Sequence, residues 1–175
     1  MNLILVGLVL VGLALIASWW RHFALAGDLR LPFELRRSEL VFAETTFRAT
    51  GRISLHARVD RAYRKPDGSY VLLELKTRGR HATYLSDVIE LSVQRVALMS
   101  ELGVPVCLHG YVVIQQRDGG PMKWMRVDLL EESAVQRLAY RRQEVLAGRE
   151  QATLSGSPRM CRCCAYAESC PTASS

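Results

Sequence analysis

The chain has 175 residues, 49% of them hydrophobic, and carries a formal net charge of +6. Apart from an apolar N-terminal segment, its length is that of one domain able to bury a core, and it contains no internal repeat or low-complexity block. These features exclude a repeat array, and the basic balance favours a polyanionic partner or a cytoplasmic membrane face.

The segment from Leu3 to Trp20 carries no charged residue and is long enough to cross a membrane as a helix. Trp19 and Trp20 would lie at the membrane interface, and positive charge begins at Arg21. By the positive-inside rule, we expect a single-pass membrane protein with a cytoplasmic C-terminal domain. The alternative is a cleaved signal peptide with a small-residue site at residues 24–26, but the absent basic n-region argues against cleavage.

Residues 27–44 form an ambiguous junction, because Pro32 interrupts them and neither the helical nor the strand period dominates. Two strands are expected next, Thr50 to Tyr63 and Ser69 to Thr77, joined by Pro66-Asp67-Gly68. That sequence is typical of a three-residue hairpin loop, in which a glycine bulge follows a type I turn.

The loop predicts the register of the hairpin. Counting outward from Lys65 and Ser69, and assuming no further bulge, Asp60 lies opposite Glu74 with Cβ atoms roughly 5 Å apart. Lys76 shares their face, because strand side chains alternate with a period of two. Adjacent carboxylates need protonation or a cation between them, and Mg²⁺ bound by Asp60 and Glu74 would meet that need. Lys76 could then orient or deprotonate the attacking water, or offset charge on phosphorus.

Two simpler interpretations stay open for this hairpin. Glu74 and Lys76 could form an ordinary ion pair on a solvated strand face. Nearby arginines predict positive charge where phosphates would approach, but they could equally be a solvated surface; they are Arg58, Arg61, Arg78 and Arg80.

A helix should follow, capped by Ser86 and Asp87, with Glu90 completing a capping box, and ending near Leu102 before Gly103. Gln94 would face outward from its third turn. There it is either an exposed helix glutamine or a contact near the metal site.

A buried strand from Val104 to Gln116 comes next, so that strand, helix and strand form a right-handed parallel crossover. A turn over residues 117–121 leads into a last strand from Met122 to Leu129. A helix from about Glu131 to Leu146 completes the domain.

Four of the five cysteines crowd into the C-terminal segment, at Cys161, Cys163, Cys164 and Cys170. Packing does not explain such crowding, which favours binding of a metal or cluster, with Zn²⁺ on the thiolates as one form and disulfides as an alternative. Cys107 stands alone in an apolar run and is expected to be a buried small hydrophobe.

The order of these motifs resembles the PD-(D/E)XK nuclease superfamily, and within it the RecB-like, CRISPR-associated exonucleases, from about Phe47 to Pro171. In that family a short strand ends in a metal-binding aspartate, as at Asp60, and the next strand carries Glu-x-Lys, as at Glu74-Leu75-Lys76. A glutamine on the following helix matches Gln94. The resemblance implies that Asp60, Glu74, Lys76 and Gln94 are catalytic, and that Asp60, Glu74 and the Leu75 carbonyl bind Mg²⁺ or Mn²⁺.

In the related nucleases, three C-terminal cysteines join an upstream cysteine to hold a 4Fe-4S cluster, and Cys161, Cys164 and Cys170 match those three. No cysteine precedes Cys107, so a cluster would recruit Cys163, Cys107, a non-cysteine ligand or a second chain. Zn²⁺, or a degenerate remnant of the family's site, are the alternatives.

We therefore predict an α/β fold, a restriction-endonuclease-like mixed sheet core flanked by helices, with an N-terminal transmembrane helix. The expected parts are an anchor (1–22), a junction (23–46), a nuclease-like domain (47–154) and a cysteine cluster segment (155–175). The predicted function is a membrane-anchored, metal-dependent DNA nuclease, of exonuclease type, with DNA and the membrane as partners. The alternatives are a catalytically degenerate module that binds nucleic acid or a partner, and a secreted disulfide-bonded protein.

Overall fold

The computed structural model describes residues 31–51, 53–117, 119–153, 158–162 and 164. The chain divides into two compact units, residues 1–135 and 136–175. The first unit contains a five-stranded sheet, made of β1 (Glu39–Ala49), β2 (Leu55–Arg64), β3 (Tyr70–Arg78), β4 (Val106–Gln116) and β5 (Lys123–Asp128).

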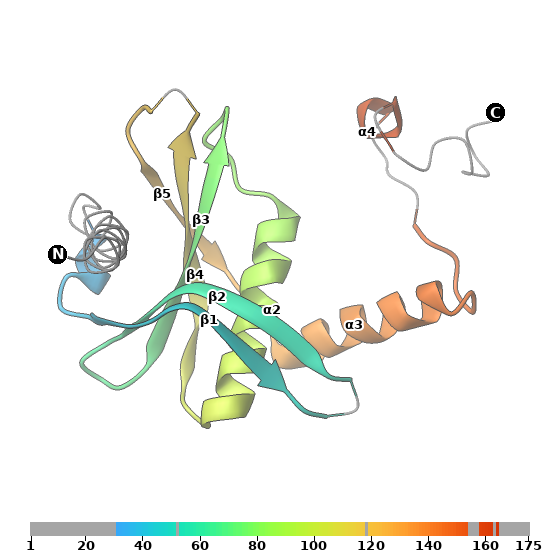
Figure 1. Cartoon of the computed structure of the whole chain (residues 1–175), viewed down its shortest axis with the longest axis horizontal. Coiled ribbons are helices and arrows are strands. Elements are labelled where there is room, and N and C mark those ends of the chain that lie inside the picture. The colour runs from blue at the N-terminus through green and yellow to red at the C-terminus, as the bar shows by residue number, and fades with distance from the viewer. Residues whose placement is uncertain (1–30, 52, 118, 154–157, 163, 165–175) are drawn as a thin grey trace, which may run out of the picture. The chain divides into compact units, whose positions relative to one another are not determined.

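The sheet is mixed, and its strands lie side by side in chain order. Neighbouring strands run antiparallel except β3 and β4, which are parallel. The helix α2 (Leu85–Leu102) connects this parallel pair and covers one face of the sheet, as Figure 1 shows. The predicted parallel connection of strand, helix and strand is thereby confirmed.

The hairpin between β2 and β3 has the predicted loop. The Lys65 N–H donates to the Ser69 carbonyl (2.8 Å), and the Gly68 N–H donates to the Lys65 carbonyl (2.9 Å). Gly68 has a φ of 83°, the left-handed conformation that the bulge position requires. The register continues as counted, through Arg64 opposite Tyr70 to Arg61 opposite Leu73.

The first strand of the sheet was not predicted. Residues 27–44 were expected to form a junction, but β1 begins at Glu39 and pairs along its length with β2. Its register shifts between Leu40 and Phe42, and most of its side chains are at least partly exposed. Because the shift breaks the period of two, no clean alternation marks this strand in the sequence. The predicted strand start at Thr50 was also wrong, since β2 begins at Leu55.

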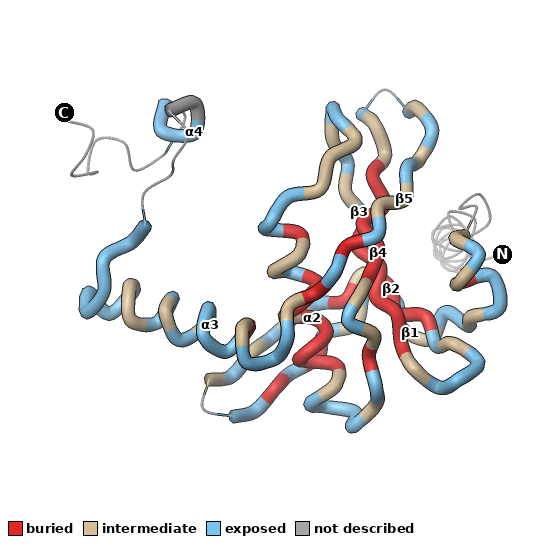
Figure 2. The backbone as a smooth tube through the Cα atoms, turned by 180° about the vertical axis from the view of Figure 1, so that it is seen from behind, coloured by how far each residue is buried: buried red, intermediate tan, exposed pale blue. Residues whose placement is uncertain are grey.

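Both faces of the sheet are covered. The larger cluster joins the sheet to α2 and includes the fully buried Leu72, Leu91 and Leu98. On the opposite face, Leu73 and Val113 pack with Leu35 of the short helix η1 (Phe33–Leu35). Figure 2 shows the buried residues following the central strands and the inner side of α2. The central strands are therefore packed on both faces, and α2 packs across one of these faces.

The ends of α2 match the prediction at one end only. Gly103 (φ 65°) ends the helix as expected, and its N–H donates to the Met99 carbonyl. At the other end the helix begins earlier than predicted, at Leu85 after Tyr84. The Asp87 carboxylate accepts a hydrogen bond from the Tyr84 N–H (2.8 Å). Asp87 is therefore the third residue of the helix, and Tyr84, not Ser86 or Asp87, is the N-cap.

The helix α3 (Glu132–Leu146) lies where it was predicted, and its fourth residue, Val135, is buried in the first unit. The second unit holds the rest of α3 and the short α4 (Pro158–Arg162). The predicted anchor, Leu3 to Trp20, lies outside the described residues. Among the helices that are described, none is both long and apolar enough to cross a membrane.

Candidate active site

Glu74 lies at the centre of the candidate site, on β3 and beneath α2. The residue is buried, with 3% exposure. One carboxylate oxygen contacts the Lys76 Nζ (2.6 Å), and the other accepts a hydrogen bond from the Gln94 Nε2 (2.8 Å). Three of the four residues predicted to be catalytic are thus joined directly.

Gln94 does not face outward as predicted, since only 2% of it is exposed. Leu91 and Leu98 lie three residues before it and four after it, and both are fully buried against the sheet. Gln94 therefore belongs to the inward stripe of α2, and this helical spacing could have revealed its orientation. Of the two roles left open for Gln94, the structure places it beside Glu74.

Asp60 approaches the same point from β2. Its Oδ2 accepts a hydrogen bond from the Leu75 N–H (2.9 Å), which belongs to the peptide bond between Glu74 and Leu75. The β2–β3 ladder ends at Arg61 and Leu73, so Asp60 and Glu74 are not a ladder pair as the count assumed.

The side chains of β2 also stop alternating regularly between the two faces of the sheet at this point. Val59 and Ala62 both pack in the cluster beneath α2, although strict alternation would put them on opposite faces. The alternation therefore breaks at Asp60 and Arg61, the kind of irregularity that turns a strand away from its neighbour.

Lys76 lies between two acidic side chains. Besides Glu74, its Nζ contacts the Oε2 of Glu90 at 2.8 Å. Glu90 was predicted only as part of a capping box, and its place in this site was missed. The signal was available, because Glu90 precedes Gln94 by four residues and so shares its side of α2.

The carboxylates shift the proton affinities of the site. Burial raises the pKa of Glu74 to about 7, aided by the negative charges of Asp60 and Glu90 and opposed by the hydrogen bonds from Lys76 and Gln94. Partial burial lowers the pKa of Lys76, but its hydrogen bonds to Glu74 and Glu90 outweigh this effect and hold that pKa above its ordinary value. The site thus holds three carboxylates, those of Asp60, Glu74 and Glu90, and one lysine, an excess of negative charge that attracts a cation.

Comparison with known proteins assigns this arrangement to a family. A family model described as the PD-(D/E)XK nuclease superfamily matches residues 13–171, a span that contains all of these side chains. The chain belongs to the PD-(D/E)XK nuclease superfamily. Its five-stranded mixed sheet with flanking helices fits the restriction-endonuclease-like α/β fold of that superfamily. Membership indicates hydrolysis of a nucleic acid.

No curated protein matches the chain. Among solved structures, the one described as "Crystal structure of SSO0001" is similar, with 15% identity and a TM-score of 0.49 over 91% of this chain and 69% of that chain.

PD-(D/E)XK nucleases typically use Mg²⁺ or Mn²⁺, and the residues present here fit such an ion. The two carboxylates of Asp60 and Glu74 and the carbonyl of Leu75 are the oxygen ligands that these cations prefer. The Gln94 Oε1 is buried without a hydrogen-bond partner, so it is available to accept from a metal-bound water. Among the described residues there is no group of three or more His, Cys, Asp or Glu that could hold a metal, so water and phosphate would complete the coordination.

The four arginines predicted to bind nucleic acid differ in their surroundings. Arg80 is exposed, and Arg58 is exposed in an ion pair with Glu44. Arg78 makes two hydrogen bonds to the buried Asp87 (2.7 and 2.5 Å), which ties β3 to the start of α2. Arg61 is buried, so the expectation of a solvated arginine surface fails for it.

The cysteine prediction falls largely outside the described part of the chain. Cys163 and Cys170 are not among the described residues, while Cys161 in α4 and Cys164 just after it are exposed. Cys107 is only half-buried, and its Sγ lies 3.6 Å from the Ser69 Oγ and 3.8 Å from the Lys65 Nζ. It is therefore less apolar in its surroundings than predicted.

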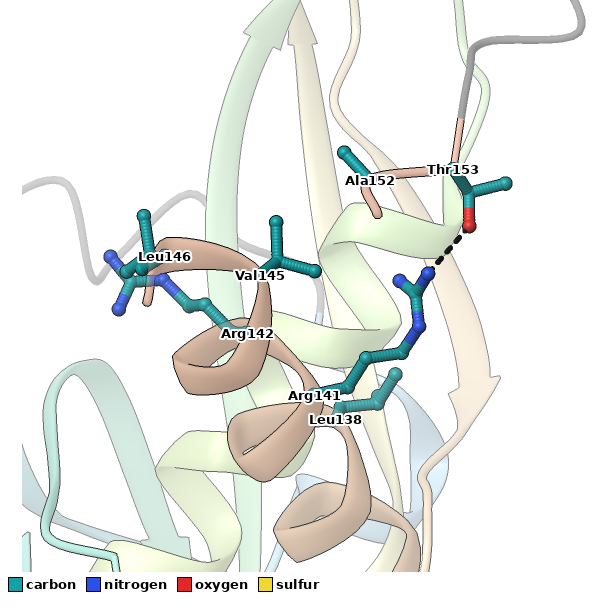
Figure 3. A pocket seen from close by; sticks show the side chains of 7 residues that line it. All are labelled: Leu138, Arg141, Arg142, Val145, Leu146, Ala152 and Thr153. Atoms are coloured by element: carbon teal, nitrogen blue, oxygen red, sulfur yellow. Dashed lines mark hydrogen bonds between the residues drawn. The ribbon is translucent and has the colours of Figure 1, made fainter. Parts of the chain in front are cut away.

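A separate pocket lies within the second unit. It has a volume of about 310 Å³ and contains none of the predicted site residues. Figure 3 shows Arg141 beside it, bound to Thr153 through a hydrogen bond of 2.8 Å. Arg142 also lines this pocket, which is formed by residues of the second unit alone.

Proposed function

We propose that this superfamily member is a Mg²⁺- or Mn²⁺-dependent DNA nuclease of the RecB-like exonuclease type. The observation that carries the proposal is the convergence on Glu74. Lys76 from β3 and Gln94 from α2 bind its carboxylate, and Asp60 from β2 binds the peptide bond beside it. Such convergence of two carboxylates, a lysine and an amide suits hydrolysis of a phosphodiester.

A divalent cation at this site would polarise the phosphate and activate a water molecule for attack. The chain's own residues divide the remaining work. Gln94 fixes the orientation of Glu74 through its Nε2, and the Leu75 N–H fixes Asp60. Because the pKa of Lys76 is raised, its Nζ stays protonated near neutral pH, and it serves to orient water or to offset phosphate charge rather than to remove a proton.

The RecB-like assignment is supported by the order of Asp60, Glu74-Leu75-Lys76, Gln94 and the C-terminal cysteines. We propose a 4Fe-4S cluster on those cysteines, with Zn²⁺ as the alternative. We also propose that Leu3 to Trp20 anchors the protein in a membrane with the nuclease domain in the cytoplasm, on the strength of its uncharged length and the arginine that follows.

The test is DNA cleavage by the full chain, purified anaerobically in detergent. End-labelled single- and double-stranded DNA and a covalently closed circle are each incubated with Mn²⁺ or EDTA. We expect metal-dependent cleavage of the linear substrates only, reduced at least about a hundredfold in Asp60→Ala and Lys76→Ala. Arg64→Ala, an exposed residue farther along β2, is the matched control and should cleave normally.

A second candidate function is binding of nucleic acid without cleavage. It is favoured by one observation, that Lys76 is already shared by two carboxylates. A folded wild-type chain that binds DNA but cuts no substrate with either metal would establish this alternative and refute the nuclease.

A further inference from the structure

Arg61 is a charged residue at the centre of the sheet that has no ion-pair partner among the described residues. It follows Asp60 directly on β2 and is 9% exposed. Its Nη1 is fully buried and has no hydrogen-bond partner. The neighbouring arginines of this strand differ, since Arg58 and Arg64 are exposed and paired with Glu44 and Glu39.

A buried guanidinium without a counter-charge is energetically unfavourable. A guanidinium is a charged group, so the burial of Arg61 places a positive charge where water is largely excluded. Buried charges in folded proteins are normally paired, because desolvation without a partner is costly. Folding alone gives no reason to keep an arginine here, whereas an anion that arrives from outside does.

A pocket of about 190 Å³ opens at this arginine. No carboxylate lines it. The apolar part of its wall is Leu75, Val113 and Met122, and the polar part is Thr77 and Gln115. A water molecule takes up about 30 Å³ of the liquid, so the pocket has room for a tetrahedral oxyanion with accompanying water.

The pocket lies on the face of the sheet opposite α2. Val113 belongs to the core cluster on that face, and Met122 packs against the same cluster. Lys76 also lines the pocket while its Nζ contacts Glu74, so the pocket and the candidate active site share a residue.

We infer that this pocket binds a phosphate group of the nucleic-acid strand on which the site acts, with Arg61 as its principal ligand. The guanidinium would donate to two phosphate oxygens, and the Thr77 hydroxyl and the Gln115 amide can donate to the others. Met122, which is unbranched and has three rotatable bonds, is the wall residue that can turn aside to expose the Arg61 Nη1. The inference rests on the proposed function, since it takes the strand as substrate.

The pocket adjoins the site because consecutive residues of β2 and β3 contribute to both. Asp60 and Glu74 belong to the candidate active site, while Arg61 and Leu75, which follow them directly in the chain, line the pocket. A nucleic-acid strand that crosses this part of the sheet would present its scissile phosphate to the carboxylates and another phosphate to Arg61. Arg61 would thereby set where the strand lies relative to the reacting bond.

The first experiment measures phosphate binding without nuclease activity. The full chain is heated in EDTA with inorganic phosphate, and separately with chloride at the same ionic strength, so that no metal site contributes. A ligand at ten times its dissociation constant should raise the Tm of a protein of this size by roughly 3 to 6 °C. We expect this rise in the wild type and in the control Arg64→Met, and its loss in Arg61→Met.

The second experiment measures oligonucleotide cleavage with Mn²⁺. We expect Arg61→Met to raise KM about tenfold or more while kcat stays within about twofold, because the contact is made equally in the bound and reacting states. Arg61→Lys keeps the charge but loses the planar fork, and it should fall between the wild type and Arg61→Met. Arg64→Met should match the wild type in both constants.

Each outcome decides the matter. An equal Tm rise in the wild type and Arg61→Met, or no rise in either, overturns the pocket even if Asp60→Ala shows that the nuclease is real. A phosphate response that needs Arg61, with KM unchanged in Arg61→Met, shows a site for free phosphate and overturns the assignment to the strand. If the wild type cleaves nothing, the proposed function fails, and the pocket is then tested by oligonucleotide affinity in EDTA. Weaker affinity in Arg61→Met supports the pocket, and unchanged affinity overturns it.

Discussion

Replacing Glu74 with glutamine should change how the stability of the metal-free protein depends on pH. The pKa of Glu74 is about 7 in the folded protein, against an ordinary 4.5, and burial is the main cause. A carboxyl whose pKa is raised on folding stabilises the protein in its protonated form. That contribution is complete below the ordinary pKa and is lost as the pH rises through 7.

The size of the effect follows from the shift. The difference between 4.5 and about 7 corresponds to about 3 kcal/mol at 1.36 kcal/mol per pH unit, and most of it is lost between pH 5 and pH 8. Glu74→Gln cannot titrate, so its free energy of unfolding should lack this fall. For a domain of this size, the wild-type Tm should drop roughly 5 to 10 °C more than that of the variant over the same range.

The assay is urea unfolding in EDTA, followed by circular dichroism at several pH values from 5 to 8. Glu131→Gln, which alters an exposed carboxylate just before α3, is the matched control and should follow the wild type. Adding Mg²⁺ at pH 8 should restore stability to the wild type and leave Glu74→Gln unchanged, because the ion's charge favours the ionised carboxylate. Parallel pH profiles for the wild type and Glu74→Gln would refute the reasoning.

Three further substitutions test how the site is held in place. Asp87→Asn should destabilise the protein by about 3 to 5 kcal/mol, because it leaves the buried end of Arg78 unpaired. Burial raises the pKa of Asp87, but the hydrogen bonds from Arg78 and Tyr84 outweigh this effect and lower that pKa below its ordinary value. Wild-type stability should therefore fall further as the pH drops below about 4, and Asp87→Asn should lack this loss. Gly103→Ala should cost about 1 kcal/mol by urea unfolding, because its φ is 65° and a Cβ there meets no atom within 4 Å; an equal loss in Gly51→Ala, whose backbone has no such φ, would contradict this cause. Leu98→Ala should cost about 2 to 5 kcal/mol by the same method, since Leu98 is fully buried between α2 and the sheet, and a loss below about 1 kcal/mol would show that the core closes over the cavity.

Local sequence signals predicted the elements whose ends and faces they mark. Pro66-Asp67-Gly68 predicted both the loop and its register, because only one common hairpin loop places glycine in that position. The apolar runs gave β4 and β5 within a few residues. The strand β1 was missed, because its register shift and its exposed edge leave no period in the sequence.

What the sequence by itself determined is the set of chemical groups and their order. Asp60, Glu74, Lys76 and Gln94, in that order and spacing, carry the resemblance to the PD-(D/E)XK nuclease superfamily, and the hairpin loop that brings the first two near each other is a local effect. Tertiary structure alone decided which groups meet. It placed Gln94 and Glu90 of α2 beside Glu74 and Lys76 of β3, and it buried Arg61. The physical reason is that the pKa of Glu74, the partners of Lys76 and the unbalanced charge of Arg61 arise from burial and from contacts between segments far apart in the chain, which no local pattern encodes.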